Sequence, residues 1–133
     1  MRYMFSLFGE EGGWEQATPE DMKAEMDRWE DFGRQAVEAG VMVAGDALQE
    51  SSTATTLRIQ DQGEPMVSDG PFAETKEQLG GYYVLDCKDL DEALEWARKI
   101  PLSSGAIEVR PVMDYGEFGY EDPLQSKEGS RTA

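Results

Sequence analysis

The sequence predicts a single α+β domain built from four strands and two helices in the order βαββαβ, with a β-hairpin inserted after the second strand. Three observations support this prediction. Short segments carry apolar residues at a period of two, longer segments carry them at helical spacing, and glycine, proline or capping residues separate the segments. A chain of 133 residues, of which 39% are hydrophobic, suits one domain with one core.

The first third of the chain predicts a strand, a long helix and a second strand. Residues Arg2–Phe8 are mostly apolar on both faces, which is typical of a central strand. Thr18 and Pro19 form a helix start, with the threonine as N-cap, and Gly40 is a suitable left-handed cap at the other end. Val41–Ala47 is again apolar on both faces. We expect the helix to bury one stripe, formed by Met22, Met26, Trp29, Gly33, Ala36 and Val37.

The middle of the chain predicts a hairpin and a third strand. Thr55–Ile59 and Glu64–Ser68 flank the turn Asp61-Gln62-Gly63, a pattern that is typical of a β-hairpin. Gly80–Asp86 follows as a strand that carries Tyr82 and Tyr83 on opposite faces. Trp14, in a polar setting earlier in the chain, is either a lid over a pocket or a packing residue.

The last third predicts a second helix and a fourth strand. Asp89 and Glu92 have the spacing of a capping box, and Pro101 ends the helix. The apolar stripe of this helix consists of Leu90, Ala93, Leu94, Ala97 and Ile100. Ala106–Val112 is the last strand, after which the periodicity is lost. The sequence therefore predicts a domain over residues 1–113 and a tail over residues 114–133.

Taken without the hairpin, these elements have the order of the ferredoxin-like βαββαβ sandwich. Helices in that fold cover one face of the sheet, yet three of the predicted strands are apolar on both faces. Because a free apolar face marks an interface, we expect a homodimer formed face to face, as in a dimeric α/β barrel. We place Phe5 and Val84 near the centre of that face and expect residues 126–133 to be mobile.

The composition excludes several classes of function. The chain has no histidine and one cysteine, Cys87, which rules out Cys/His zinc sites, Ser-His-Asp triads, Cys-His dyads and an internal disulfide. We read Cys87 as a small apolar residue and expect no bound metal and no cofactor. The net charge of −16 disfavours nucleic acid and anionic membranes. No apolar run matches a membrane helix or a signal peptide, so we expect a cytoplasmic protein.

The connection Val67–Gly81 is the candidate functional loop, because it is longer than the roughly 4–6 residues that a plain connector needs. Asp69 precedes the Gly70-Pro71 bend, where its carboxylate could accept loop N–H groups or act as a general base. We expect Asp69 to be poorly solvated, with Phe72 buried behind it. Lys76 could bind an anion or pair with a nearby acid. The alternative is an ordinary ordered loop in which Asp69 caps its own turn.

The same loop resembles a known family. Asp69-Gly70-Pro71-Phe72 and the following segment Ala73–Tyr83 resemble the signature of the DGPF-domain proteins, a branch of the YCII-related family. Further matching segments are Arg2–Met4, Ala39–Val41, Asp89–Ala97, Ile100-Pro101 and Ile107–Val112. The resemblance covers residues 1–113 and implies a ferredoxin-like fold that dimerises, without a settled activity.

In YCII-related proteins a His–Asp pair has been put forward as catalytic, and Asp69 is the candidate counterpart of that aspartate. The absence of histidine from this chain departs from the pattern and counts against catalysis of that type.

Three functions are compatible with these observations. The first and preferred one is binding, with or without a reaction, of a small molecule in a cleft near Asp69. The second is a non-enzymatic interaction module, for which the resemblance implies an association with extracytoplasmic-function sigma factors and the acidic surface suits a basic protein. The third is a dimer that has lost its catalysis. The candidate ligand-binding residues are Asp69, Gly70, Pro71, Phe72, Lys76, Tyr82 and Arg110.

Overall fold

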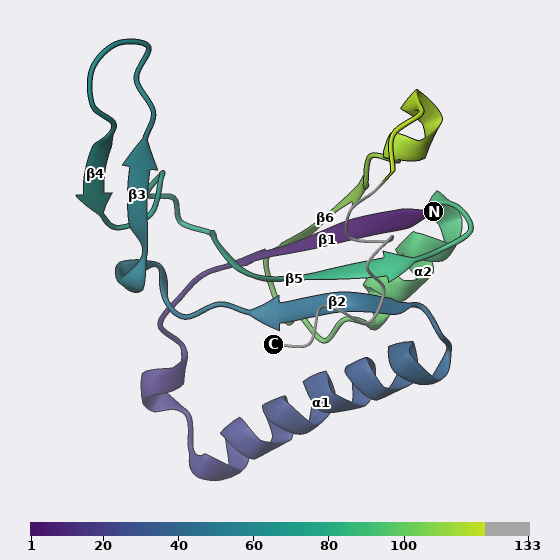
Figure 1. The fold of residues 1–133 in the computed structure, drawn as a ribbon. Coiled ribbons are helices and arrows are strands. Elements are labelled where there is room, and N and C mark those ends of the chain that lie inside the picture. Colours follow the sequence, from purple (N-terminus) through teal and green to yellow (C-terminus); the bar gives the residue numbers. More distant parts are fainter. Residues whose placement is uncertain (122–133) are drawn as a thin grey trace.

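The computed structural model describes residues 1–121 and has an α+β fold (Figure 1). Its strands and helices are β1 (Arg2–Gly9), α1 (Pro19–Glu38), β2 (Met42–Ala47), β3 (Thr55–Arg58), β4 (Met66–Asp69), β5 (Gln78–Asp86), α2 (Leu90–Lys99) and β6 (Ala106–Pro111). Three short 3-10 helices are η1 (Trp14–Gln16), η2 (Ser51–Thr53) and η3 (Tyr115–Phe118). The predicted order of elements is confirmed. The residues expected to be mobile, 126–133, lie outside the described part of the chain.

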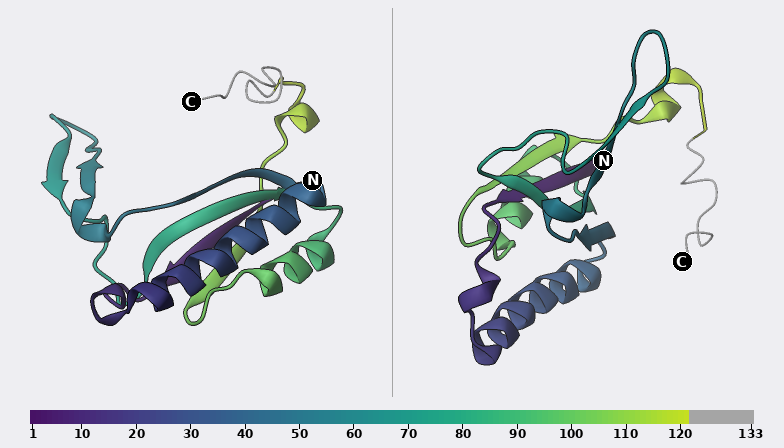
Figure 2. Two further views of the ribbon diagram at one scale, coloured as in Figure 1. Left: turned by 90° about the horizontal axis from the view of Figure 1, so that it is seen from below. Right: turned by 90° about the vertical axis from the view of Figure 1, so that its left-hand side faces the viewer.

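The main sheet has the strand order β2-β5-β1-β6, and each neighbouring pair is antiparallel. Both helices lie on the same face of this sheet (Figure 2). This arrangement is compatible with the ferredoxin-like fold that the element order predicts. The pair β3-β4 forms a separate two-stranded sheet that projects from one end of the main sheet, on the side away from the helices (Figures 1 and 2).

The core lies between the main sheet and the two helices. Its buried side chains are Tyr3, Phe5, Leu7, Phe32, Ala36, Leu85, Cys87, Ala93 and Ile100. The ring of Phe32 lies 5.0 Å from that of Tyr83 and 6.1 Å from that of Trp96, so one aromatic side chain of α1 contacts both the sheet and α2.

The buried stripe of α1 differs from the predicted one. Phe32 and Ala36 are buried and Trp29 is half-buried, whereas Met22, Met26 and Val37 are exposed. The stripe is rotated around the helix toward Phe32, because this ring fills the space between Tyr83 and Trp96.

The predicted caps are confirmed for α1 and partly for α2. Thr18 accepts a hydrogen bond from the Asp21 N–H at 3.1 Å and donates its own N–H to the Asp21 carboxylate. Asp89 accepts the Glu92 N–H at 2.9 Å. The Glu92 carboxylate accepts the N–H of Lys88 rather than that of the cap residue, so the α2 box is displaced by one residue.

No helix of residues 1–121 covers the second face of the main sheet, here called the open face (Figure 2). Strand alternation places Met4, Ser6 and Phe8 there, since Tyr3, Phe5 and Leu7 point into the core. The expected face-centre position Phe5 is therefore wrong, because it is fully buried against the helices. Across the strands, Met4 lies between Val84 and Arg110, while Ser6 lies between Tyr82 and Glu108.

The β3-β4 hairpin and η3 project from opposite ends of the open face, away from the helices (Figure 2). No helix in the described residues is long and apolar enough to cross a membrane.

Candidate functional site

Three loops converge at the end of the sheet where β1 and β2 finish and β5 begins. The loop after β2 is joined to β5 by the Leu48 N–H, which donates to the Gly80 carbonyl at 2.9 Å. It is joined to the loop after β1 by the Ser51 N–H, which donates to the Glu11 carboxylate at 2.7 Å. The central loop between β4 and β5 is joined to the loop after β1 by an ion pair of 3.2 Å between Lys76 and Glu10.

The contact with Ser51 also lowers the pKa of the Glu11 carboxyl. Glu11 accepts both the hydroxyl and the N–H of Ser51, and these two hydrogen bonds, the hydroxyl first, hold the pKa of the Glu11 carboxyl below its usual range.

The bend of the central loop is fixed at Gly70. Its φ of 100° lies in the left-handed region that favours glycine. The Gly70 N–H donates to the Ala54 carbonyl and the Gly70 carbonyl accepts the Thr56 hydroxyl, both at 2.7 Å. At the other end of the loop, the Gln78 side-chain amide donates to the carbonyls of Ala73 and Thr75. The loop is therefore anchored at both ends, as functional loops on a rigid scaffold are.

The loop after β2 and the central loop, together with Phe8 of β1, line an open pocket of about 580 Å³, here called the loop pocket. Its apolar lining consists of Phe8, Leu48, Ala54, Pro71, Phe72, Ala73 and Leu79. Among residues 1–121, the charged residues in its lining are Glu50 and Glu77. A neighbouring pocket of about 310 Å³ shares Phe8, Leu48 and Glu50 with it and extends to Trp14 and Trp29. This size and this mainly apolar lining are those of small-molecule sites.

Phe72 is 73% exposed, so the expectation that it is buried behind Asp69 is wrong. Its ring lines the loop pocket. The Arg58 guanidinium lies over this ring, 5.0 Å from the ring centroid. The bend at Gly70 turns the loop so that the ring contacts β3 rather than the core.

Asp69 is the last residue of β4, where it pairs with Thr55, and its side chain is exposed. The expected low solvation is therefore wrong. Within residues 1–121, no hydrogen bond of its carboxylate is recorded and none of the described pockets includes it. The reason lies in the bend, whose backbone groups are satisfied by Ala54 and Thr56 instead. A catalytic or ligand-binding role for Asp69 stays a prediction.

The other predicted site residues lie in two different places. Gly70, Pro71, Phe72 and Lys76 belong to the central loop, and Lys76 lines a shallow hollow with Phe8 and Glu10 beside the loop pocket. Tyr82 and Arg110 lie on the open face. The Tyr82 hydroxyl donates to Asp46 at 3.0 Å, and the Arg110 guanidinium pairs with Glu108 at 2.6 Å. The structure therefore does not bring Tyr82 and Arg110 into the loop pocket.

Several lining residues of the loop pocket escaped the sequence analysis. Leu48 is an apolar residue at the start of a polar connector, and this contrast is the one signal that could have identified it. Glu50 carries no local signal, because only the convergence of distant loops brings it to the pocket.

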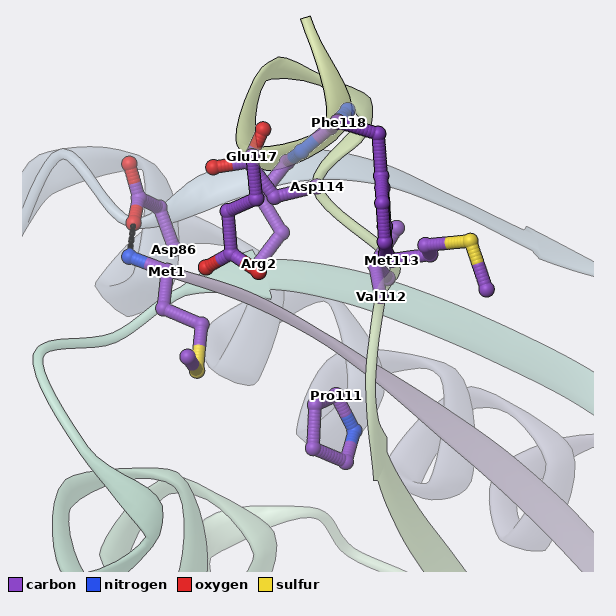
Figure 3. Close-up of a pocket in the computed structure, with 9 residues that line it drawn as sticks. All are labelled: Met1, Arg2, Asp86, Pro111, Val112, Met113, Asp114, Glu117 and Phe118. Carbon is purple, nitrogen blue, oxygen red and sulfur yellow. Dashed lines mark hydrogen bonds and ion pairs between the residues drawn. The ribbon is translucent and has the colours of Figure 1, made fainter.

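A further pocket, of about 590 Å³, lies at the far end of the sheet beneath η3 (Figure 3). The Met1 amino group faces the Asp86 carboxylate there at 3.0 Å, and Phe118 of η3 forms part of its wall. None of the predicted site residues lines it.

Cys87 is buried in the core, and this burial raises the pKa of its thiol to about 11. The interpretation of Cys87 as a small apolar residue is confirmed. Within the described residues, no group of three or more Cys, Asp or Glu is placed to hold a metal ion.

Comparison with known proteins supports the resemblance to the YCII-related family. The family model of the YCII-related domain matches residues 1–116. An uncharacterised protein of Rhizobium meliloti (strain 1021) is 49% identical over 85 residues, which span 62% of this chain and 68% of that protein.

Proposed function

Because the chain belongs to the YCII-related family, we propose that it is a homodimer that binds a small organic molecule in the loop pocket. The observation that carries the proposal is the pocket itself. Two loops that are distant in sequence, together with Phe8 of β1, place apolar side chains around about 580 Å³, and the Asp69–Phe72 motif that carries the family resemblance contributes Pro71 and Phe72 to the wall. A motif that serves only as a turn would not need a large exposed aromatic ring at the edge of a pocket.

The open face supports the dimer. Its central side chains include Met4, which is 37% exposed, and Val84, and apolar surface of this kind is typical of interfaces. A second copy placed face to face by two-fold symmetry would give the dimeric α/β barrel. Phe8 follows Met4 and Ser6 along β1 and also lines the loop pocket, so a partner on the open face would lie beside the pocket and narrow its mouth.

The proposal is tested by ligand screening against a filled pocket. A library of small organic molecules is screened by ligand-observed NMR with the wild-type chain, and the hits are titrated against Leu48→Arg. Leu90→Arg on α2 is the matched control, because both leucines are 49% exposed and only Leu48 lines the pocket. We expect Leu48→Arg alone to lose the hits. Hits that survive Leu48→Arg, or a screen without hits, would contradict the proposal.

A second candidate function is that of a protein-interaction module for a basic partner such as an extracytoplasmic-function sigma factor. The supporting observation is the hairpin, on which Leu57 and Val67 form a directly opposed and exposed apolar pair. Sedimentation of Leu57→Lys/Val67→Lys separates the two uses of this surface. A weakened homodimer would assign the hairpin to self-association, whereas an unchanged homodimer would leave it to another protein.

A further inference from the structure

We infer that the loop pocket selects organic cations, that is, molecules with an apolar body and an ammonium or similar group. This inference rests on the proposed function and adds the chemical class of the ligand. It follows from three features of the pocket: the sign of its charged lining residues, the engagement of the neighbouring cations, and the aromatic ring at its edge.

The charged lining has one sign. Glu50 and Glu77 are the charged residues that line the loop pocket, and the neighbouring pocket adds Glu10 and Glu11. No ion pair of Glu50 or Glu77 is recorded among residues 1–121, and both carboxylates are exposed. The two carboxylates would therefore repel an anionic ligand, whereas a cationic ligand could form ion pairs with them.

The nearby basic side chains are already engaged. Lys76 pairs with Glu10 at 3.2 Å, and Arg58 lies over the ring of Phe72. Neither of these basic residues lines the loop pocket. Glu10 neutralises Lys76, whereas Arg58 keeps its charge on the far side of the Phe72 ring. The charged groups in the lining itself are the glutamates, and the net charge of −16 adds attraction for cations over a longer range.

The aromatic ring at the edge of the pocket already contacts a cation. The Arg58 guanidinium lies 5.0 Å from the Phe72 ring centroid, which is a cation–π distance. Phe8 is a second aromatic side chain in the lining, and Leu48 and Leu79 offer contact to an apolar body. Such a combination of rings, aliphatic surface and carboxylates matches an amphiphilic amine better than a neutral or acidic molecule.

The test uses three probes of equal chain length, n-hexylammonium, n-hexanol and hexanoate, titrated at pH 7 into the full chain by NMR. We expect n-hexylammonium to bind most tightly and hexanoate least. Exposed ion pairs correspond to about a 2- to 5-fold change in affinity each. Glu50→Gln/Glu77→Gln should therefore lower the affinity for n-hexylammonium about 4- to 25-fold and leave the affinity for n-hexanol unchanged.

The matched control is Glu64→Gln/Glu95→Gln, which removes the same net charge at two exposed glutamates outside the pocket. The affinity of this control variant for n-hexylammonium should stay within 2-fold of the wild-type affinity. High salt should weaken the binding of n-hexylammonium to the wild-type chain and leave the binding of n-hexanol unaffected, because salt screens exposed charges.

The outcomes separate the inference from the proposed function. If n-hexanol binds to the wild-type chain but not to Leu48→Arg, the pocket is a binding site. If, in addition, n-hexylammonium binds no more tightly than n-hexanol, or binds Glu50→Gln/Glu77→Gln as tightly as wild type, the cation preference is wrong. Hexanoate as the tightest probe would also overturn the preference. If no probe binds, or binding survives Leu48→Arg, both the proposed function and the inference fail.

Discussion

Gly70 shows how the conformation of one residue shapes the loop pocket. Its left-handed backbone lets its N–H and carbonyl bond to Ala54 and Thr56 while the chain turns into Pro71 and Phe72. Space does not demand a glycine there, because an added Cβ would meet no atom within 4 Å. The demand comes from φ alone.

Gly70→Ala should therefore destabilise the fold by about 1–2 kcal/mol, the cost of a left-handed conformation for a residue with a Cβ. The check is the free energy of unfolding from urea titration. Gly13→Ala is the control, since Gly13 also has open space around it but a φ of −78°. An equal loss of stability in both variants would contradict the argument.

Glu11 supplies a pH-dependent link between two loops of the site. Its pKa is lowered in the folded chain by the Ser51 hydroxyl and N–H. Because the pKa of Glu11 is lower in the folded chain than in the unfolded chain, its ionised carboxylate stabilises the fold. This stabilisation is fully present above the unfolded pKa of about 4.3 and is lost as the pH falls through the folded pKa. An NMR titration of the Glu11 carboxyl should show its pKa rise in Ser51→Ala, whereas Ser52→Ala should leave it unchanged. A titration midpoint that is the same in Ser51→Ala and wild type would refute the link.

The helices show what a single hydrogen bond at an element's end contributes. Asp89 accepts the Glu92 N–H at the start of α2. This helix places Ala93 in the core, and Ile100, its C-cap residue, is buried there as well.

Asp89→Ala should destabilise the fold by about 1 kcal/mol, and Asp89→Asn by only a few tenths, because the amide oxygen still accepts the N–H. Thermal or urea unfolding of the two variants measures the difference. Asp91→Ala, in the same turn but outside the cap, is the control. Equal losses in the alanine and asparagine variants at residue 89 would show that the carboxylate acts through its charge and not as a cap.

At the scale of elements, the sequence predicts where strands and helices begin and end better than which side they bury. Caps and breakers are local, so Thr18, Gly40 and Pro101 identify helix ends correctly. The buried stripe of α1 depends on the distant rings Tyr83 and Trp96, which select Phe32 over Met26 and Val37.

The same reason limits prediction of the site. Pro71 and Phe72 could be found because the motif is continuous in sequence. Leu48 and Glu50 could not, since hydrogen bonds between separate loops bring them there.

At the scale of the molecule, helices of the described part of the chain cover one face of the sheet, and none of them covers the other (Figure 2). On β1, the side chains of Tyr3, Phe5 and Leu7 belong to the covered face, and those of Met4, Ser6 and Phe8 belong to the open face. The hairpin and η3 project at the two ends of the open face, so a second copy would lie between them (Figure 2). This geometry gives the dimer proposal a variant that separates association from folding.

Val84→Asp should convert the homodimer into a folded monomer. Val84 lies on the open face beside Met4 and Ala44, so the carboxylate stays in water in the monomer and would be buried without a partner charge in the dimer. The measurement is analytical ultracentrifugation, with circular dichroism to show that the fold is kept. Val37→Asp, on the exposed side of α1, should remain dimeric.

Phe5→Asp provides the opposite comparison, because Phe5 is fully buried between the sheet and the helices. An unpaired carboxylate there should unfold the chain rather than separate two folded copies. The dimer proposal requires these two aspartates, one on each face of neighbouring strands, to give different results. It would be overturned by a wild-type chain that sediments as a monomer at tens of micromolar, or by a Val84→Asp variant that remains dimeric.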